Sequence, residues 1–199
     1  MKLLSWNVQG LGGPLHRRYR GRLRQALKPC LMDGPVDNMM VQEHHLNEKR
    51  IRSYGNLLPG IWQMLWSPAI GTSGTQGGVC MAIADKWKPC IIGKEVIVPG
   101  RAQYVVIHEM QTTWSCLNVY IPFHAAARKQ FWVEIAPTVP QVDHWCVAGD
   151  FNMIEDLEVR IGRSRKQSWW LQNSRNLIKK TKNTTWLRTR THRANYNIS

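Results

Sequence analysis

Short apolar runs alternate with turn-forming residues along much of the chain, a pattern typical of β-strands. The run at 36–42, with Met39, Met40 and Val41 at its centre, predicts a strand that is buried on both faces of a sheet. Apolar positions at helical spacing predict helices, and Asn47 is the expected cap of one of them. Strands are predicted at residues 2–6, 36–42, 61–66, 78–84, 91–98, 103–110, 114–120 and 144–148, and helices at 17–31, 47–54, 125–135 and 168–180.

The order of these elements predicts an α/β fold. Strand–helix–strand units lie towards both ends of the sequence, and hairpin-like strands lie between them. This order favours two mixed β-sheets packed face to face with helices outside. The sequence has 199 residues and contains no repeat or linker, so a single domain covering 1–199 is expected.

Polar side chains follow three of the apolar runs, at the point where each predicted strand ends. They are Asn7, Glu43 and the pair Asp150 and Asn152. Residues just beyond strand ends line the ligand crevice of parallel and mixed sheets. Carboxylate and amide oxygens are the ligands that Mg²⁺ prefers. Taken singly, each residue is explained more simply by an ordinary turn or a solvated strand end, but the ordered combination favours a Mg²⁺ site of a phosphodiester hydrolase.

Within the polar groups, Asp150 and Asn152 are expected on one extended segment, with their side chains on the same side. One of them is suited to activate a water molecule and the other to hold a phosphate. Asn7 is suited to orient the phosphate or Glu43. His44 and His45 follow Glu43 and are expected to be exposed loop residues, with support of the site as the alternative.

The chain is strongly basic, with a formal net charge of +14, and the charge is segregated. No Asp or Glu precedes Asp33 or follows Glu158, while basic residues are frequent in both end regions. Single charges usually form a solvated surface, but two basic ends favour contact with a phosphate backbone, with an acidic membrane surface as the second alternative. The candidate DNA-binding residues are Arg17, Arg18, Arg20, Lys179, Lys180 and Lys182.

Five cysteines without paired spacing predict free thiols in a reducing compartment. The first residues become polar too early for a signal peptide, and no apolar stretch approaches the ~20 residues of a membrane span. The sequence therefore favours an intracellular protein that is not membrane-bound.

Five segments, in this order, resemble the endonuclease/exonuclease/phosphatase superfamily. They are most similar to the endonuclease domain of non-LTR (LINE-type) retrotransposon polyproteins. The resemblance covers residues 1–160 and leaves a divergent basic tail at 161–199. The segments are Ser-Trp-Asn-Val-Gln-Gly-Leu-Gly at 5–12, Asp-Asn-Met-Met-Val-Gln-Glu at 37–43, Gly-Gly-Val at 77–79, Asn-Val-Tyr-Ile-Pro at 118–122 and Gly-Asp-Phe-Asn at 149–152.

The resemblance implies a four-layer α/β sandwich that cleaves DNA with Mg²⁺, or Mn²⁺ in its place. Glu43 and Asn7 would lie at the metal, Tyr120 would contact the phosphate, Asp150 would activate the water and Asn152 would hold the phosphate. Asp37 would be structural. The resemblance also implies a monomer without a small-molecule cofactor, which acts in the nucleus if it serves a retrotransposon.

The sequence departs from the family near its C-terminus. The family carries a Ser-Arg-x-Asp segment and then Ser-Asp-His, whose histidine handles the scissile phosphate or a proton. Residues 159–199 contain no Asp or Glu, and the lone His192 is more typical of a surface residue. We therefore expect an incomplete C-terminal part and slow cleavage. A catalytically dead nucleic-acid-binding remnant is the alternative, and a small-phosphoester hydrolase is a third possibility that the basic surface disfavours.

Overall fold

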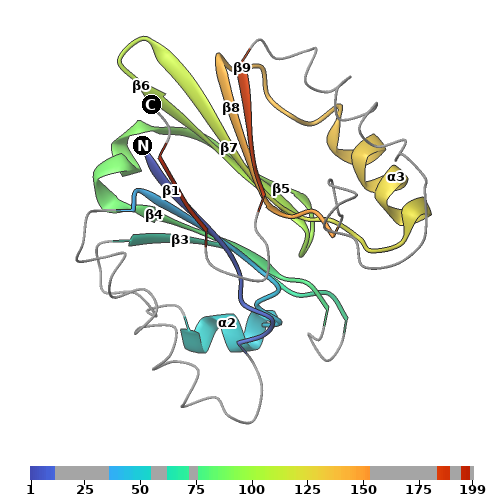
Figure 1. Ribbon diagram of the computed structural model, residues 1–199. Coiled ribbons are helices and arrows are strands. Elements are labelled where there is room, and N and C mark those ends of the chain that lie inside the picture. Colours follow the sequence, from blue (N-terminus) through green and yellow to red (C-terminus); the bar gives the residue numbers. More distant parts are fainter. Residues whose placement is uncertain (12–35, 55–61, 72–75, 153–182, 189–193, 198–199) are drawn as a thin grey trace.

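Two five-stranded β-sheets form the centre of the protein (Figure 1). The computed structural model describes residues 1–11, 36–54, 62–71, 76–152, 183–188 and 194–197. Predicted helices at 17–31 and 168–180 lie outside these residues. Within the described residues, no helix has the length and apolar character needed to cross a membrane.

The first sheet has the strand order β10-β1-β2-β4-β3. Strand β1 runs parallel to β2, with Asn7 opposite Gln42 at their carboxyl ends. The other pairs are antiparallel. Its strands are β1 (Lys2–Asn7), β2 (Asn38–Gln42), β3 (Trp62–Ser67), β4 (Val79–Ala84) and β10 (Ala194–Asn197).

The second sheet has the order β5-β6-β7-β8-β9. Strands β5, β6 and β7 form an antiparallel meander, and β7, β8 and β9 are parallel. Tyr120 and Asp150 are register partners at the carboxyl ends of β7 and β8. The strands are β5 (Ile91–Val98), β6 (Ala102–Glu109), β7 (Thr112–Tyr120), β8 (His144–Asp150) and β9 (Asn183–Arg188).

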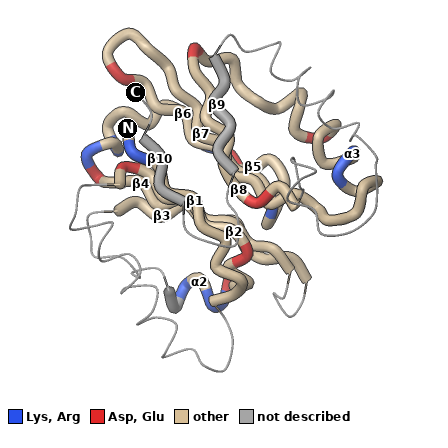
Figure 2. The backbone as a smooth tube through the Cα atoms, viewed as in Figure 1, with Lys and Arg blue, Asp and Glu red and all other residues tan. Residues whose placement is uncertain are grey.

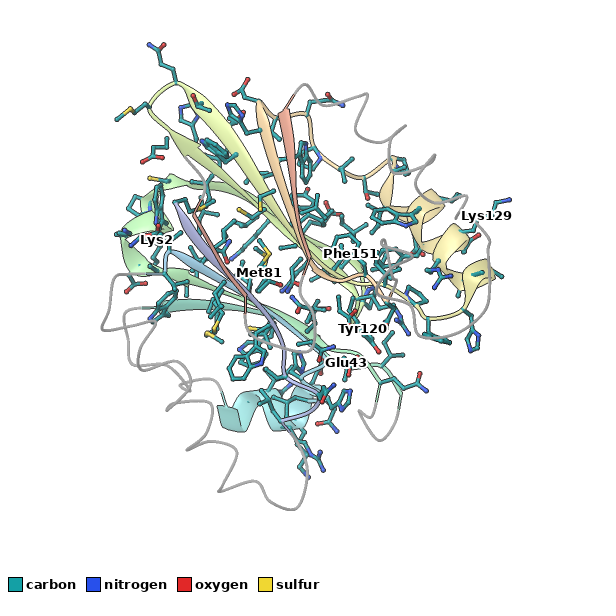
Figure 3. All side chains as sticks on the ribbon, in the orientation of Figure 1. Lys2, Glu43, Met81, Tyr120, Lys129 and Phe151 are labelled. Atoms are coloured by element: carbon teal, nitrogen blue, oxygen red, sulfur yellow. The ribbon has the colours of Figure 1, made fainter. Side chains whose placement is uncertain are left out.

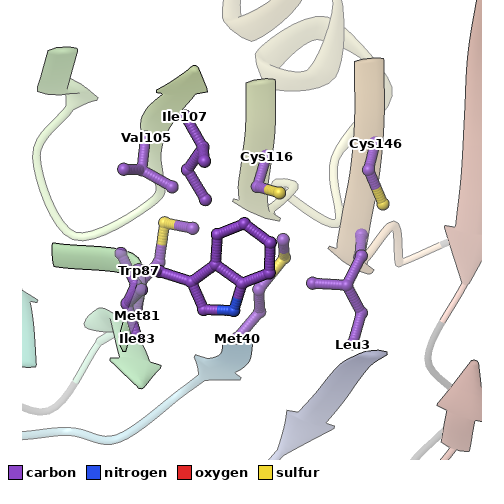
Figure 4. Close-up of a cluster of buried hydrophobic side chains, with 10 residues drawn as sticks. Leu3, Met40, Met81, Ile83, Trp87, Val105, Ile107, Cys116 and Cys146 are labelled. Atoms are coloured by element: carbon purple, nitrogen blue, oxygen red, sulfur yellow. The ribbon is translucent and has the colours of Figure 1, made fainter. Parts of the chain in front are cut away.

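The two sheets pack face to face through apolar side chains from both (Figure 4). Leu3, Met40 and Met81 of the first sheet belong to the same buried cluster as Ile107 and Cys116 of the second. Burial of this apolar surface is the main force that holds the sheets together. Charged residues lie mostly in helices, turns and strand ends, so the strand segments that cross the core are nearly free of charge (Figure 2).

A helix covers the outer face of each sheet. Helix α2 (Glu48–Tyr54) packs Ile51 against the first sheet, and its first turn is capped by Asn47, whose Oδ1 accepts from the Arg50 amide at 3.0 Å. Helix α3 (Ala125–Ile135) buries Phe131 and Trp132 against the second sheet. A short 3₁₀ helix, η1 (Asp85–Cys90), connects β4 to β5. The predicted four-layer α/β sandwich is therefore confirmed.

The predicted strands up to residue 148 and the helices at 47–54 and 125–135 are all present, with ends shifted by one or two residues. Strands β9 and β10 lie within the basic tail and were not predicted. Each adds an edge strand to one sheet, so residues 183–188 and 194–197 are integral to the fold. Cys80, Cys116 and Cys146 are buried free thiols, as predicted.

Candidate active site

Four of the predicted site residues converge where the two sheets meet at the carboxyl ends of their parallel strands. Asn7 ends β1, Glu43 directly follows β2, Tyr120 ends β7 and Asp150 ends β8. Parallel neighbours bring their carboxyl ends to one edge of a sheet, and the two sheets are packed with these edges together. Glu43 and Tyr120 lie close together at this edge (Figure 3).

The first link between the sheets joins Asn7 to Asp150, 143 positions apart in the sequence. The Asn7 side-chain amide donates to Asp150 Oδ2 at 2.6 Å, and Asn7 Oδ1 accepts from the Gln9 amide at 3.0 Å. Asn7 is 4% exposed, so these two bonds fix its amide orientation. The carboxamide therefore holds one oxygen of Asp150 in place.

The other oxygen of Asp150 is held from its own chain segment. Asp150 Oδ1 accepts from the Asn152 backbone amide at 2.8 Å. This contact requires a turn, and Asn152 has a φ of 48° in the left-handed region. The expectation of an extended segment with Asp150 and Asn152 side by side is therefore wrong. The Asn152 side-chain amide instead donates to the Ile121 carbonyl at 2.6 Å.

Glycine is required just before Asp150. Gly149 has a φ of 150°, and a Cβ there would come within 1.9 Å of the Val119 carbonyl oxygen. Strands β7 and β8 can approach this closely only without a side chain at that position. The Gly-Asp pair thus sets the distance between Tyr120 and Asp150.

Tyr120 and Glu43 lie beside each other across the sheet interface, with the phenol hydroxyl facing the carboxylate. Burial, and then the neighbouring Glu43 carboxylate, raise the pKa of Tyr120 to about 12, so the hydroxyl keeps its proton at neutral pH. The Arg101 guanidinium lies 5.2 Å from the centre of the Tyr120 ring. The phenol therefore lies between a carboxylate and a cation.

Glu43 lies on a tight turn whose backbone is in the left-handed region, with φ values of 54° at Glu43 and 55° at His45. Strained non-glycine backbone of this kind is held in place by its surroundings. The Gly10 amide donates to the Glu43 carbonyl at 2.7 Å, and His45 Nε2 lies 3.8 Å from Glu43 Oε2. The turn directs the chain from β2 towards α2.

His44 provides much of this support. It is fully buried, so the expectation of an exposed loop residue is wrong for His44, while His45 is partly exposed. Its Nδ1 accepts from the Leu46 amide at 3.0 Å, which leaves Nε2 to donate to the Ser67 carbonyl at 3.1 Å. Burial lowers the pKa of His44 to about 4, so the ring is neutral. A Cβ at Gly78 would come within 2.5 Å of this ring, which explains the glycine there.

A buried pair of carboxamides lies directly behind the site. Gln42 precedes Glu43, and its amide donates to Asn118 Oδ1 at 2.7 Å across the sheet interface. The Asn118 amide in turn donates to the Val41 and Cys80 carbonyls at 3.1 and 3.0 Å. These side chains are 0% exposed, so their bonds tie β2 and β4 to β7 in a dry environment.

The donor set at this edge fits a magnesium ion. Within the described residues, no cluster of three or more His, Cys, Asp or Glu is present. Mg²⁺ keeps several waters and takes only one or two protein carboxylates. Glu43, Asp150 and the amide oxygen of Asn7 are hard oxygen donors of that kind.

Asp37 lies away from this edge. Its carboxylate pairs with Lys86 Nζ at 2.5 Å and accepts from the Lys2 amide, at the amino ends of β1 and β2. Its pKa is lowered because these hydrogen bonds and the Lys86 charge together outweigh burial, the largest single influence, which acts to raise it. A structural role was expected for it, and this location is consistent with that role.

Arg101, Arg128, Gln42 and Asn118 are site neighbours that sequence reasoning did not single out. Gln42 and Asn118 do stand inside two of the quoted motifs, which was a usable signal, whereas no signal pointed to Arg101. The candidate DNA-binding residues Arg17, Arg18, Arg20, Lys179, Lys180 and Lys182, together with His192, lie outside the described residues.

Several solved structures have a similar architecture. The AP endonuclease LMAP from Leishmania major has a TM-score of 0.63 at 15% identity, covering 90% of this chain and 66% of that chain. D. rerio TDP2 complexed with single strand DNA product has a TM-score of 0.56 at 15% identity over 80% of this chain and 63% of that chain. An endonuclease/exonuclease/phosphatase from Bacteroides vulgatus has a TM-score of 0.57 at 12% identity over 77% and 66%. The chain has the endonuclease/exonuclease/phosphatase fold.

Sequence similarity to a transposon protein accompanies this fold. The chain is 24% identical over 166 residues to the Transposon TX1 uncharacterized 149 kDa protein of Xenopus laevis. The match covers 80% of this chain and 12% of that protein. No protein-family model matches the chain. The transposon match supports the retrotransposon link expected from the motifs.

Proposed function

We propose that this chain is a Mg²⁺-dependent phosphodiester hydrolase of the retrotransposon endonuclease type that acts on DNA. The observation that carries the proposal is the convergence of Asn7, Glu43, Tyr120 and Asp150, with the hydrogen bond from Asn7 to Asp150 joining the two sheets and Tyr120 facing Glu43. The fold relatives support a nucleic acid substrate, since one is an AP endonuclease and another was solved with a single-stranded DNA product. Retrotransposon activity would place the site of action in the nucleus.

Each residue has a role that its contacts support. Glu43 and Asn7 would hold Mg²⁺, which when bound supplies positive charge against the phosphate oxygens. The Asp150 carboxylate, oriented through both oxygens, accepts a proton from the attacking water. The Tyr120 hydroxyl has a single hydrogen, which faces Glu43 in the free chain; with substrate bound it would turn from Glu43 and donate to a phosphate oxygen. Asn152 has two amide hydrogens, and the bond to Ile121 uses one, which leaves the other for the phosphate.

We further propose that turnover is slow. In the family, an acidic residue orients the histidine that handles the proton. Residues 159–199 contain no Asp or Glu that could do so. Among the described residues, the imidazole of His45 lies beside the candidate site. Its neighbour there is Glu43, the proposed metal ligand. Loss of a positioned general acid or base costs on the order of 10²–10⁴ in rate.

The test is a plasmid-nicking assay with Mg²⁺, with Mn²⁺ and with EDTA. Glu43→Gln and Asp150→Asn retain the side-chain shapes and remove the charge, so nicking should fall by roughly 100-fold or more. Glu109→Gln is the matched control, since Glu109 is exposed at the opposite end of β6. Nicking that resists both site substitutions would refute the proposal.

A second function, DNA binding without cleavage, is favoured by the net charge of +14 and the missing acidic residue. The assay separates the two. Absence of nicking by the unmodified chain, together with DNA binding that weakens steeply with salt, would establish the binding remnant instead.

A further inference from the structure

Phe123 is an aromatic side chain exposed beside the candidate active site. It follows Tyr120 by three positions in the segment that leads from β7 into α3, and it is 73% exposed. Single exposed apolar side chains are ordinary on protein surfaces, and Phe123 differs from the others in having an aromatic ring close in sequence to the candidate site. Its ring lies edge-on to the neighbouring His124, at 5.8 Å between centroids.

The backbone of Phe123 is tied to the site. Arg128 Nη1 donates to the Phe123 carbonyl at 2.7 Å and to the Asn152 carbonyl at 3.3 Å. Asn152 in turn donates to the Ile121 carbonyl at 2.6 Å. One guanidinium and one carboxamide therefore hold the Phe123 segment against the turn that orients Asp150. The ring is displayed on a fixed backbone a few residues from the candidate phosphate site.

We propose that Phe123 stacks against a nucleobase of the DNA strand held at this site. The location of the phosphate rests on the proposed function, and the contact with Phe123 would be made by the base of the adjoining nucleotide. A DNA strand that places a phosphate between Tyr120 and Asp150 carries its bases within reach of neighbouring surfaces. An exposed aromatic ring accepts any base face, and the positive charge of Arg128 beside it favours the phosphodiester chain. A base must leave its own stack to use this ring, so single-stranded DNA is the favoured ligand.

The experiment measures stacking without cleavage. The full chain is titrated in EDTA into single-stranded oligonucleotides that carry 2-aminopurine, whose fluorescence falls when the base stacks on an aromatic ring. Phe123→Ala should lose the fluorescence quenching and weaken binding roughly 10-fold, while Phe123→Tyr should retain both. Because Phe123 carries no charge, the salt dependence of binding should be unchanged in both variants.

Met110→Ala is the matched control, since Met110 is 92% exposed in the turn between β6 and β7, at the opposite end of those strands. It should bind and quench like the unmodified chain. Equal quenching by the Phe123→Ala variant, or no binding of the oligonucleotides by the unmodified chain, would overturn the inference. Quenching that depends on Phe123 in a chain that never nicks DNA would sustain the inference and reject the proposed hydrolase.

Discussion

At the scale of single residues, two tyrosine–glutamate pairs occur among the described residues. The Tyr120 hydroxyl faces Glu43 at the candidate site, and Tyr104 donates to Glu95 Oε2 at 2.8 Å on the surface of the second sheet. Burial and the neighbouring carboxylate raise the pKa of each tyrosine to about 12. The two phenols thus both face a carboxylate, and they differ in what surrounds them: Tyr120 also has Asp150 and Arg101 close by.

This duplication provides a controlled test of Tyr120. Tyr120→Phe removes one hydroxyl donor and keeps the ring, so the nicking rate should fall by roughly 100-fold through loss of phosphate stabilisation. Tyr104→Phe removes a donor whose hydrogen-bond partner is Glu95, which is not a site residue, and it should leave the rate unchanged. The measurement is the initial rate of supercoiled plasmid conversion with Mg²⁺. Equal rates for the two variants would exclude Tyr120 from the reaction.

His44 makes stability depend on pH. Burial lowers its pKa in the folded chain to about 4, against 6.5 in the unfolded chain, so between these values only the unfolded chain is protonated. The stabilisation is therefore complete above pH 6.5 and is lost as the pH falls towards 4. Between pH 6.5 and pH 5 the free energy of unfolding should fall by about 2 kcal/mol.

Urea unfolding at several pH values in EDTA measures this loss. His44→Gln keeps a donor and an acceptor but cannot titrate, so its stability should change little across the window. His124→Gln, at an exposed position, should behave like the unmodified chain. A pH response that survives in His44→Gln would assign it to other groups.

At the scale of secondary structure elements, sequence periodicity predicted the strands that form apolar runs and missed those that do not. Strand β2 is fully buried and has the apolar residues Met39, Met40 and Val41 at its centre. Strand β9, with the sequence Asn-Thr-Thr-Trp-Leu-Arg, and β10, Ala-Asn-Tyr-Asn, are short and polar. Their strand character comes from pairing with β8 and β1, which no local pattern encodes.

The same distinction applies to the site. The strand-end position of Asn7, Glu43 and Asp150 follows from local patterns, so the sequence predicted which edge they would share. The hydrogen bond between Asn7 and Asp150 depends on how the two sheets pack. The turn at Asn152 depends on the hydrogen bond from its backbone amide to the Asp150 carboxylate. Contacts of this kind are set by tertiary packing and lie beyond single-sequence reasoning.

The buried carboxamide pair that joins β2 to β7 should be costly to break. Asn118→Ala removes the side-chain donor of the Val41 and Cys80 carbonyls and one acceptor of the Gln42 amide, which keeps Ser5 Oγ and the Met40 carbonyl as partners. Each hydrogen bond lost from a buried group costs about 1–3 kcal/mol. Urea unfolding should show a loss of at least about 2 kcal/mol. A double-mutant cycle with Gln42→Ala should show coupling, because the two side chains share a bond.

Gln111→Ala, in the exposed β6–β7 turn, is the control for this carboxamide pair and should be nearly neutral. Additive effects of the Asn118 and Gln42 substitutions would show that the pair does not act as a unit. A loss of nicking greater than the loss of folded protein would extend its role to positioning Glu43 and Tyr120.

At the scale of the whole molecule, each sheet contributes a parallel strand pair whose carboxyl ends face the same edge. Strands β1 and β2 supply Asn7 and Glu43, and β7 and β8 supply Tyr120 and Asp150. The site thus forms only when the sheets pack together, which couples its assembly to the apolar interface in Figure 4. Folding and site formation should accordingly be lost in one step when urea is added.

The basic end regions should dominate the affinity for DNA. Each phosphate neutralised by Lys or Arg contributes about −0.9 to the slope of log K against log salt for duplex DNA. Substitution of Arg17, Arg18 and Arg20 by Gln, or of Lys179, Lys180 and Lys182 by Gln, should reduce this slope by up to about 3, in proportion to the number of phosphates that these side chains neutralise. The slope is measured by fluorescence anisotropy of DNA binding at salt concentrations of about 50 to 200 mM.

Lys88→Gln combined with Lys94→Gln provides the comparison, because both lysines are exposed and η1, which carries Lys88, lies at the end of β4 away from the site. This variant lowers the net charge while leaving the basic ends intact, so its slope should stay close to that of the unmodified chain. If all three variants lower the slope equally per charge, binding reflects net charge alone. A larger change for the end-region variants would show that particular arginines and lysines contact phosphates, whether or not the bound strand is then cut.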